Sequence, residues 1–316
     1  MDNILVTGAS GFVGSHLVSS LKREHQVFSL VHNNLRGKWQ EDALSNTVQV
    51  TGDVRNVHLI KETVARFGIN EVYHLSALPI VKTAYLDPWS VYGVNINGTV
   101  AVLEACRLLS VGRVLLLCTD KVYGDKVGAS EEDKPEATEP YATSKICQRY
   151  IAESYGRTYG MNIVIAHACN IFGYDPYSDR IFPNAIRACI AGESPVIYTN
   201  DHSVRQYVYV EDVVEALRVL KSKHDAQGLY NMTTTWTYTA EQIVKKILEH
   251  FPSITPRYEE KPSLQPPLQI SRSITESKRF DWSPRWTFDA AIKLTIDKFA
   301  KYKNDWSKQN QREDNL

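Results

Sequence analysis

The chain has 316 residues, 43% of them hydrophobic and 23% charged, so it is long enough to bury a large core in one or two domains. Lysine plus arginine and aspartate plus glutamate number 36 each, and this balance gives no sign of nucleic acid or a membrane surface as the main partner. There is no apolar run of 18 residues, and the five cysteines are odd in number and lack C-x-x-C spacing. The first residues enter a predicted strand at once, so we expect no secretory leader. We therefore expect a soluble, cytoplasmic chain with reduced thiols.

Short β-branched or leucine-rich segments alternate with segments of helical spacing along the first half of the chain. In the segment 58–67, for example, Ile60, Val64 and Phe67 share one helical face. Strands that alternate with helices predict an α/β fold whose parallel, doubly wound sheet is buried on both faces. The predicted strands cover residues 3–7, 26–31, 47–50, 71–75, 113–118 and 162–167.

This alternation stops after residue 168, where loop-forming sequence interrupts it. Helical spacing returns at 210–220 and 239–250, and residues 261–269 are rich in proline. We expect a first domain over 1–168 with return segments near 205–235, and a smaller mixed α/β lobe over 169–300. Residues 301–316 are expected to form a polar, frayed or disordered tail.

The segment VTGASGFVGSHL places three glycines between the first strand and an amphipathic helix. Glycine permits a tight turn and lets backbone amides approach a pyrophosphate at the positive end of the helix dipole. This context predicts a Rossmann-type dinucleotide site. Its predicted residues are Gly8, Gly11, Phe12, Val13 and Gly14.

The end of the second strand bears on the choice between NAD and NADP. No acidic residue precedes Glu41 there to bind a ribose 2′-hydroxyl, whereas Arg36 and Lys38 are available for a 2′-phosphate. This pattern favours NADP slightly, with NAD held by Asn33 and the backbone amides as the alternative. Asp53 and Val54 follow the third strand, where Asp53 can read an adenine amino group or cap the next helix.

Polar residues end the strand 113–118 and recur one helix later. Thr119, Asp120 and Lys121 place a hydroxyl, a carboxylate and an ammonium at the strand tip. In YATSK, Tyr141 and Lys145 share one helical face, so the ammonium is expected near the phenol, where it lowers the phenol pKa toward neutrality. The two groups together predict an active site for hydride chemistry at the carboxyl ends of the strands.

The chain resembles the extended short-chain dehydrogenases/reductases of the nucleotide-sugar epimerase/dehydratase family. The resemblance covers residues 3 to 220 and is carried by TGASGFVG, HLSA, NINGT, YATSK, ACNIFG and VRQYVYVEDVVEAL. Within the family, the Asp-Lys pair, PIVKTAYLDP and the stretch from Asp175 to Ser178 most resemble CDP-glucose 4,6-dehydratase. The resemblance implies tightly bound NAD or NADP and a nucleotide-sugar substrate of the CDP-glucose or GDP-mannose type. It also implies a homodimer, which we expect to pair across a two-fold axis through apolar residues of the helices after NINGT and around YATSK: Val100, Leu103, Leu108, Cys147, Ile151 and Tyr155.

The resemblance also implies a role for each residue of the site. Tyr141, Lys145 and Thr119 would serve the oxidation of the sugar at C4. Asp120, which we expect a closed site to keep protonated, would protonate the leaving C6 hydroxyl, and Lys121 would remove the C5 proton if its pKa is lowered. The expected substrate-binding residues are Lys82, Asn170, Arg180 and Arg205.

Two other functions use the same motifs. A 4-epimerase or 4-keto-sugar reductase needs Thr119, Tyr141 and Lys145 but gives Asp120 and Lys121 no task. A non-catalytic dinucleotide-binding protein needs only the glycine-rich loop. The histidines show no ligand spacing, so we expect no metal site, and we expect His74 to be a core residue.

Overall fold

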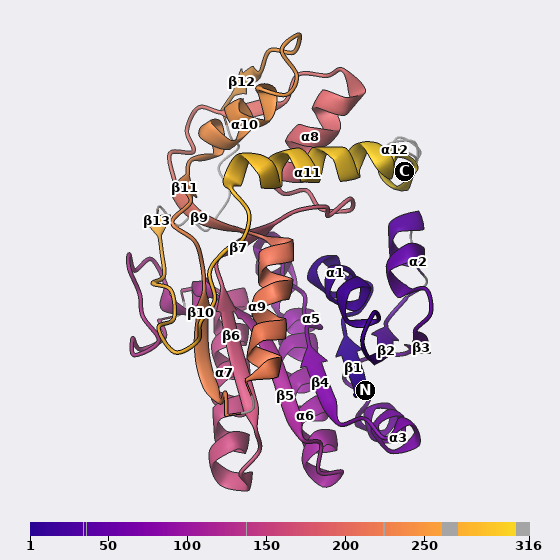
Figure 1. Ribbon diagram of the computed structural model, residues 1–316. Coiled ribbons are helices and arrows are strands. Elements are labelled where there is room, and N and C mark those ends of the chain that lie inside the picture. The colour runs from indigo at the N-terminus through magenta and orange to yellow at the C-terminus, as the bar shows by residue number, and fades with distance from the viewer. Residues whose placement is uncertain (34, 36, 137, 224, 261–270, 308–316) are drawn as a thin grey trace.

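The computed structural model describes residues 1–33, 35, 37–136, 138–223, 225–260 and 271–307. Within these residues, seven parallel strands form a central sheet, as the sequence predicts (Figure 1). The predicted six strands are joined by one from the second half of the chain. In spatial order the strands are β10 (Gly228–Met232), β6 (Ile163–Ala168), β5 (Arg113–Thr119), β4 (Glu71–His74), β1 (Asn3–Thr7), β2 (Gln26–Val31) and β3 (Val48–Thr51).

Helices cover both faces of this sheet, because the strand side chains are apolar on both faces. In Figure 1, α1 and α9 lie in front of the sheet, with α2 beside α1, and α6 and α7 lie behind it. The front helices are α1 (Phe12–Leu21), α2 (Lys38–Leu44) and α9 (Val210–Ser222). The helices behind are α3 (Val57–Phe67), α6 (Gly98–Leu108) and α7 (Pro140–Tyr159). The short helices α4 (Val81–Leu86) and α5 (Pro88–Tyr92) and the π-helical turn η1 (Gly93–Asn97) connect β4 to α6.

A smaller lobe lies beyond the carboxyl ends of the strands, at the top of Figure 1. Its aromatic core includes Phe172 stacked on Phe182, with ring centroids 4.3 Å apart. One of its sheets holds β7 (Asn170–Phe172), β9 (Val204–Tyr209), β11 (Thr237–Tyr238) and β13 (Ser271–Arg272), and the other pairs β8 (Val196–Tyr198) with β12 (Arg257–Glu259). Its helices are α8 (Ile181–Ala191), α10 (Ala240–Leu248) and α11 (Phe288–Lys301).

The chain returns from the lobe to the central sheet through α9 and β10, whereas β9 stays in the smaller sheet. The return therefore occupies only part of the range 205–235 expected for it. The proline-rich residues 261–269 lie outside the described residues.

The first residues of the expected polar tail are ordered and docked. They form α12 (Lys303–Ser307), in which Asp305 is 8% exposed and accepts hydrogen bonds of 2.8 Å from the backbone amides of both Lys38 and Trp39. The expectation of a frayed tail is wrong for this helix, because Asp305 satisfies the amides at the start of α2. Residues 308–316 lie outside the described residues.

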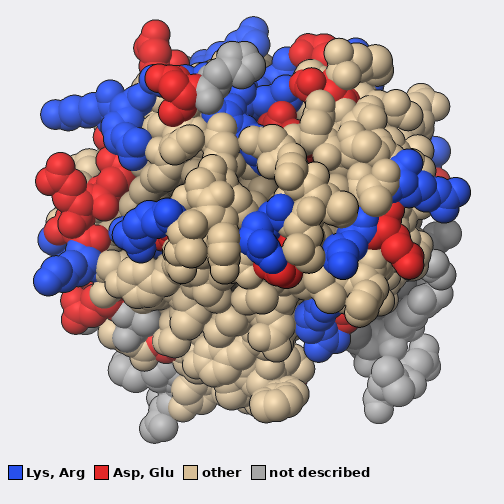
Figure 2. Space-filling view, turned by 90° about the horizontal axis from the view of Figure 1, so that it is seen from below, with Lys and Arg blue, Asp and Glu red and all other residues tan. Residues whose placement is uncertain are grey.

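Figure 2 shows the molecule from the lower end of Figure 1. Lysine, arginine, aspartate and glutamate side chains lie over the upper part, the sides and the middle of this face, and its lower central part is largely uncharged.

His74, at the end of β4, is 1% exposed and held between two threonines. Its ring nitrogens lie 2.8 Å from the Thr7 hydroxyl and 2.9 Å from the Thr99 hydroxyl. Burial lowers the pKa of His74 to about 3, with the nearby Lys145 acting in the same direction. His74 is therefore a neutral core histidine, as the sequence analysis expects.

This burial predicts a pH dependence of stability. The folded-state pKa of His74 is lower than the unfolded value of about 6.5, so the contribution of the neutral ring is complete above that pH and is lost as the pH falls toward 3. Between pH 7 and pH 5 the free energy of unfolding should fall by about 2 kcal/mol more in the natural chain than in His74→Asn. Urea unfolding of both proteins at the two pH values measures this difference, and parallel pH dependences would contradict the prediction.

Candidate active site

The glycine-rich loop between β1 and α1 is too closely packed to hold side chains. Gly8 has a φ of 71°, and a Cβ there would lie 2.8 Å from the backbone nitrogen of Ser76. A Cβ at Gly14 would overlap the carbonyl oxygen of Gly8. The N-cap residue of α1, Gly11, has no side chain to bond the first amides of the helix, so those amides can serve a phosphate.

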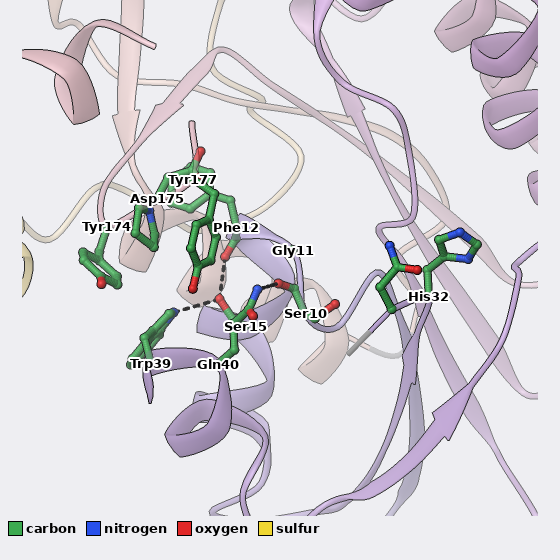
Figure 3. Close-up of a pocket in the computed structure, with 12 residues that line it drawn as sticks. Ser10, Gly11, Phe12, Ser15, His32, Trp39, Gln40, Tyr174, Asp175 and Tyr177 are labelled. Carbon is green, nitrogen blue, oxygen red and sulfur yellow. Dashed lines mark hydrogen bonds between the residues drawn. The ribbon is translucent and has the colours of Figure 1, made fainter. Parts of the chain in front are cut away.

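A cavity of about 260 Å³ lies beside this loop (Figure 3). The Trp39 indole donates to the Ser15 hydroxyl at 3.0 Å and the Gln40 amide to the Ser10 carbonyl at 2.6 Å, so α2 is bonded to the loop and to α1. Phe12 lines the cavity at the first turn of α1, and Asn33 does so just beyond β2. The other lining residues are Ser10, Gly11, Ser15, His32, Trp39, Gln40, Tyr174, Asp175, Pro176 and Tyr177.

Two of the residues expected to bind the cofactor beyond the glycine-rich loop, Lys38 and Asp53, have partners within the chain. The Lys38 ammonium lies 2.9 Å from Asp42 on the same helix, and Arg36 lies outside the described residues. The Asp53 carboxylate accepts from the Arg55 guanidinium at 3.0 Å, and it does not cap α3, because Asn56 does. Val54, next to it, is buried.

Thr119 ends β5, and Asp120 and Lys121 open the 3₁₀ turn η2 (Asp120–Tyr123). The Thr119 hydroxyl donates to the Asp120 carboxylate at 3.1 Å, and the Lys121 amide donates to the Thr119 hydroxyl at 3.4 Å. The predicted hydroxyl, carboxylate and ammonium are thus brought together at one strand tip.

Asp120 also has a partner that the sequence analysis does not predict. Its carboxylate is 2% exposed and accepts from the Arg272 guanidinium at 3.2 Å. The carboxylate is buried, as expected for a closed site, and its two oxygens accept hydrogen bonds from Thr119 and Arg272. The expected proton on Asp120 stays a prediction.

Lys121 meets the condition set for a lysine base. Burial is the main cause that lowers the pKa of Lys121 to about 8, and the positive charges of Arg272 and Arg205 lower it further. The carboxylates of Asp120 and Glu139 oppose this shift. A fraction of Lys121 is therefore a neutral amine near neutral pH.

Tyr141 and Lys145 lie on α7, which begins beside the strand tip. The Glu139 side chain caps this helix and accepts from the amides of Tyr141 and Ala142 at 2.7 and 2.8 Å. The structure buries both predicted side chains, with Tyr141 6% and Lys145 4% exposed.

The expected effect of Lys145 on the phenol is not present. Burial raises the pKa of Tyr141 above its ordinary value, while Arg180 and a hydrogen bond with Thr119 oppose the rise. The Lys145 ammonium donates to the Leu117 carbonyl at 3.2 Å, and burial lowers the pKa of Lys145. The prediction of a lowered phenol pKa is therefore wrong for this structure, because the helical spacing does not account for the cost of burial.

The four expected substrate-binding residues differ in their surroundings. Arg205 on β9 forms an ion pair with Asp201 at 3.7 Å, and the Asn170 amide donates to the Gln206 carbonyl at 2.8 Å. Arg180, just before α8, is exposed but lies near enough to affect the pKa of Tyr141. Lys82 is exposed on α4.

Arg272, Glu139 and Asn95 belong to the site but are absent from the predicted set. Asn95 is fully buried, accepts from the Leu78 amide at 2.8 Å and donates to the Ser144 hydroxyl at 2.9 Å, so it joins the loop after β4 to α7. An acidic residue followed by proline before a helix is a start signal that could have identified Glu139. No local pattern marks Arg272.

All five cysteines are free thiols. Among the described residues, no group of three histidine, cysteine, aspartate or glutamate side chains could hold a metal ion. In the same part of the chain, no helix has the length and hydropathy needed to cross a bilayer.

The chain belongs to the NAD dependent epimerase/dehydratase family, which it matches over residues 4–232. The expected family is therefore confirmed. Two epimerase structures share the fold: the UDP-glucose 4-epimerase of Thermotoga maritima with UDP-glucose has a TM-score of 0.86 at 25% identity, over 95% of this chain and 99% of that one. The UDP-glucose 4-epimerase of Thermus thermophilus with NAD has a TM-score of 0.85 at 27% identity, over 94% and 99%.

Curated dehydratases are similar in sequence. The chain is 27% identical to the trifunctional UDP-glucose 4,6-dehydratase/UDP-4-keto-6-deoxy-D-glucose 3,5-epimerase/UDP-4-keto-L-rhamnose-reductase of Arabidopsis thaliana, over 96% of this chain and 48% of the plant protein, so it spans about half of that relative. It is 24% identical to the dTDP-D-glucose 4,6-dehydratase of Mus musculus, over 96% of this chain and 90% of the mouse protein.

The glycine-rich loop generates a binding prediction. The Cβ of Gly11→Val would face the cavity 3.1 Å from the Gly8 carbonyl oxygen, so the variant should fold but lose dinucleotide binding by at least about tenfold, because the side chain covers the first amides of α1. Fluorescence titration with NAD and with NADP measures the loss. Gly156→Ala on α7, with its nearest neighbour 3.6 Å away, is the control and should bind normally. Unchanged binding in Gly11→Val would refute the phosphate-loop assignment.

Proposed function

We propose that the chain is a nucleotide-sugar 4,6-dehydratase, which converts an NDP-hexose to the NDP-4-keto-6-deoxyhexose. The observation that carries this proposal is the strand tip of β5, where Asp120 and Lys121 stand as an acid and base pair beside Thr119. Tyr141 lies close enough to the same tip to hydrogen-bond Thr119. Oxidation alone would leave Asp120 and Lys121 without a task.

The first step is the oxidation of C4. A nicotinamide dinucleotide, held by the glycine-rich loop, would supply the hydride acceptor and the later return of the hydride. Tyr141, as phenolate, takes the proton of the C4 hydroxyl, and Thr119 donates a hydrogen bond to the same oxygen. The nearby cation of Arg180 favours the phenolate, against the burial that disfavours it.

The second step removes water across C5 and C6, which the C4 ketone makes possible by acidifying the C5 proton. Lys121, as a neutral amine, takes the C5 proton, and the C6–O bond breaks as Asp120 gives a proton to the leaving oxygen. Asp120 must first be released by one of its two donors in order to carry that proton. Thr119 provides this release when its hydroxyl turns from Asp120 to the C4 oxygen.

In the third step C5 regains a proton, and C6 would receive the hydride held by the bound cofactor, so the reaction has no net oxidation. Lys121, now an ammonium, is the proton donor to C5, and this proton transfer restores its amine. Tyr141 then holds the proton taken from the C4 hydroxyl, and Asp120 lacks the proton given to the leaving oxygen. Passage of one proton from Tyr141 to Asp120 restores the starting state of both residues.

Two other functions remain as alternatives. A 4-epimerase or 4-keto-sugar reductase is favoured by the similarity to UDP-glucose 4-epimerases, but it gives no task to Asp120 and Lys121. A non-catalytic dinucleotide-binding protein has no use for the buried Tyr141 and Lys145. Only a dehydratase yields a 4-keto-6-deoxy sugar, which alkaline ultraviolet absorbance detects.

We propose NAD as the cofactor, in place of the NADP that the sequence slightly favours. The Lys38 ammonium is paired with Asp42, and the Asp305 carboxylate takes the amides at the start of α2. A 2′-phosphate there would meet the negative charge of Asp305. Competitive titration with NAD and NADP decides between the two.

The nucleotide of the substrate is open to a direct screen. The sequence resemblance favours CDP-glucose or GDP-mannose, whereas the named relatives and structures carry UDP or dTDP in their names. Incubation with CDP-, GDP-, dTDP- and UDP-hexoses, with detection of the 4-keto product, tests both the activity and the nucleotide.

The proposed division of labour predicts that two substitutions stop the reaction at different steps. Asp120→Asn cannot protonate the leaving oxygen, so it should still reduce bound cofactor on addition of substrate while product formation falls about 10²-fold or more. Tyr141→Phe should lose cofactor reduction as well, because the C4 proton has no acceptor. Nicotinamide absorbance and product analysis separate the two variants. A near-normal product rate in Asp120→Asn would remove the main support for a dehydratase.

We also propose a homodimer formed by α6 and α7. Val100 and Leu108 on α6 are 37% and 47% exposed, and Tyr150 and Tyr159 on α7 are 49% and 53% exposed. The expected interface changes in one respect, because Leu103 is 1% exposed and belongs to the core. The other expected residues, Cys147, Ile151 and Tyr155, are partly buried.

Light scattering at micromolar concentration should therefore report a dimer for the natural chain. Leu108→Glu should shift the mass toward the monomer, because it places a charge in the apolar contact. Val127→Glu, at an apolar residue that is 70% exposed elsewhere, is the control and should leave the mass unchanged. A monomeric natural chain would contradict the proposal.

A further inference from the structure

Arg272 enters the site from a segment far along the chain. Parallel pairing of β13 with β9 sets Arg272 opposite Arg205. Gln206 fixes this segment from β9: its side chain accepts from the Ile274 amide at 2.8 Å and donates to the Ile274 carbonyl at 3.1 Å. The backbone around Arg272 is therefore held in register with the smaller sheet.

The Arg272 guanidinium and the Asp120 carboxylate form a buried ion pair. Their side chains are 5% and 2% exposed, and the guanidinium nitrogen lies 3.2 Å from the carboxylate oxygen. A buried charge is costly unless it is paired and hydrogen-bonded, and removal of one partner leaves the other uncompensated. The second Asp120 oxygen accepts from Thr119 at 3.1 Å, so the carboxylate is held from two sides.

We propose that Arg272 is a positioning residue of the active site, which fixes Asp120 at the tip of β5 and keeps a permanent positive charge beside Lys121. The step that this serves, removal of the C5 proton by Lys121, rests on the proposed dehydratase function. The placement of the charge does not rest on it.

The charged groups around Lys121 come from four elements. Arg272 on β13 and Arg205 on β9 disfavour the ammonium, whereas Asp120 in its own turn and Glu139 before α7 favour it. Burial acts together with the arginines, and the pKa of Lys121 is lowered to about 8. An arginine is suited to this role because it cannot be deprotonated in a protein. Without Arg272, the unpaired Asp120 would attract the ammonium more strongly.

The direct test is the titration of Lys121 itself, which needs neither substrate nor turnover. Nuclear magnetic resonance of protein labelled with ¹³C at lysine Cε gives the midpoint, and the signal missing from Lys121→Met identifies the residue. In Arg272→Met the midpoint should rise by about one pH unit or more. Arg272→Lys restores a cation and should bring the midpoint most of the way back.

Two further variants separate charge from structure. Arg272→Gln keeps a hydrogen-bond donor for Asp120 without the charge, so the Lys121 midpoint should also rise in this variant. It replaces Arg272→Met in the test if that variant does not fold. Arg279→Met is the matched control. Arg279 donates to the Leu229 carbonyl at 2.8 Å and stacks on Tyr230, so its loss should lower stability and leave the Lys121 midpoint in place. An unchanged midpoint in a folded Arg272→Gln would overturn the inference.

The pH profile of turnover gives the second readout. The rate should rise with pH as Lys121 becomes an amine. In Arg272→Gln this rise should move to higher pH, and the rate of product formation at pH 7 should fall about tenfold if the Lys121 midpoint rises by about one pH unit. If the natural chain forms no 4-keto-6-deoxy sugar, the proposed function fails while the titration still tests Arg272. If the natural chain is active and neither the midpoint nor the profile moves, the inference about Arg272 fails alone.

Discussion

The parallel direction of the central sheet is the constraint on which the site depends. Because every strand runs the same way, the loops that leave the strands all emerge at one edge. The glycine-rich loop leaves β1 there, the Asp53 turn leaves β3, and the Thr119 tip leaves β5. Residues more than a hundred positions apart in the chain, such as Gly8 and Thr119, thus reach the same edge of the sheet.

The smaller lobe completes the site with side chains from the second half of the chain. β9 carries Arg205 and binds β13, which brings Arg272 onto Asp120. α12 places Asp305 on the first amides of α2, which borders the cavity beside the glycine-rich loop. Both ends of the proposed cofactor and substrate site therefore depend on contacts from the last part of the chain.

The sequence predicts those features that are written in local patterns. The strands follow from short apolar runs, the tight loop between β1 and α1 from glycine spacing, and the placement of Tyr141 and Lys145 on one helix from their separation of four residues. Arg272 pairs with a residue 152 positions away through a strand of two residues, too short for any periodicity, and Asp305 contacts a residue 267 positions away. The direction of a buried group's pKa shift also escapes local patterns, because burial is a property of the whole fold.

Burial and fixed charge together decide which groups can act as bases here. Burial favours the neutral forms of titratable side chains, so it raises the pKa of Tyr141 and lowers the pKa values of Lys121 and Lys145. Burial therefore disfavours the phenolate of Tyr141 and favours the neutral amine of Lys121, which are the two proposed bases. Arginine side chains favour the basic form of both residues, since a cation near Tyr141 favours its phenolate and a cation near Lys121 disfavours its ammonium. The position of each arginine, and not the sum of charge in the site, therefore sets the chemistry that its neighbours can perform.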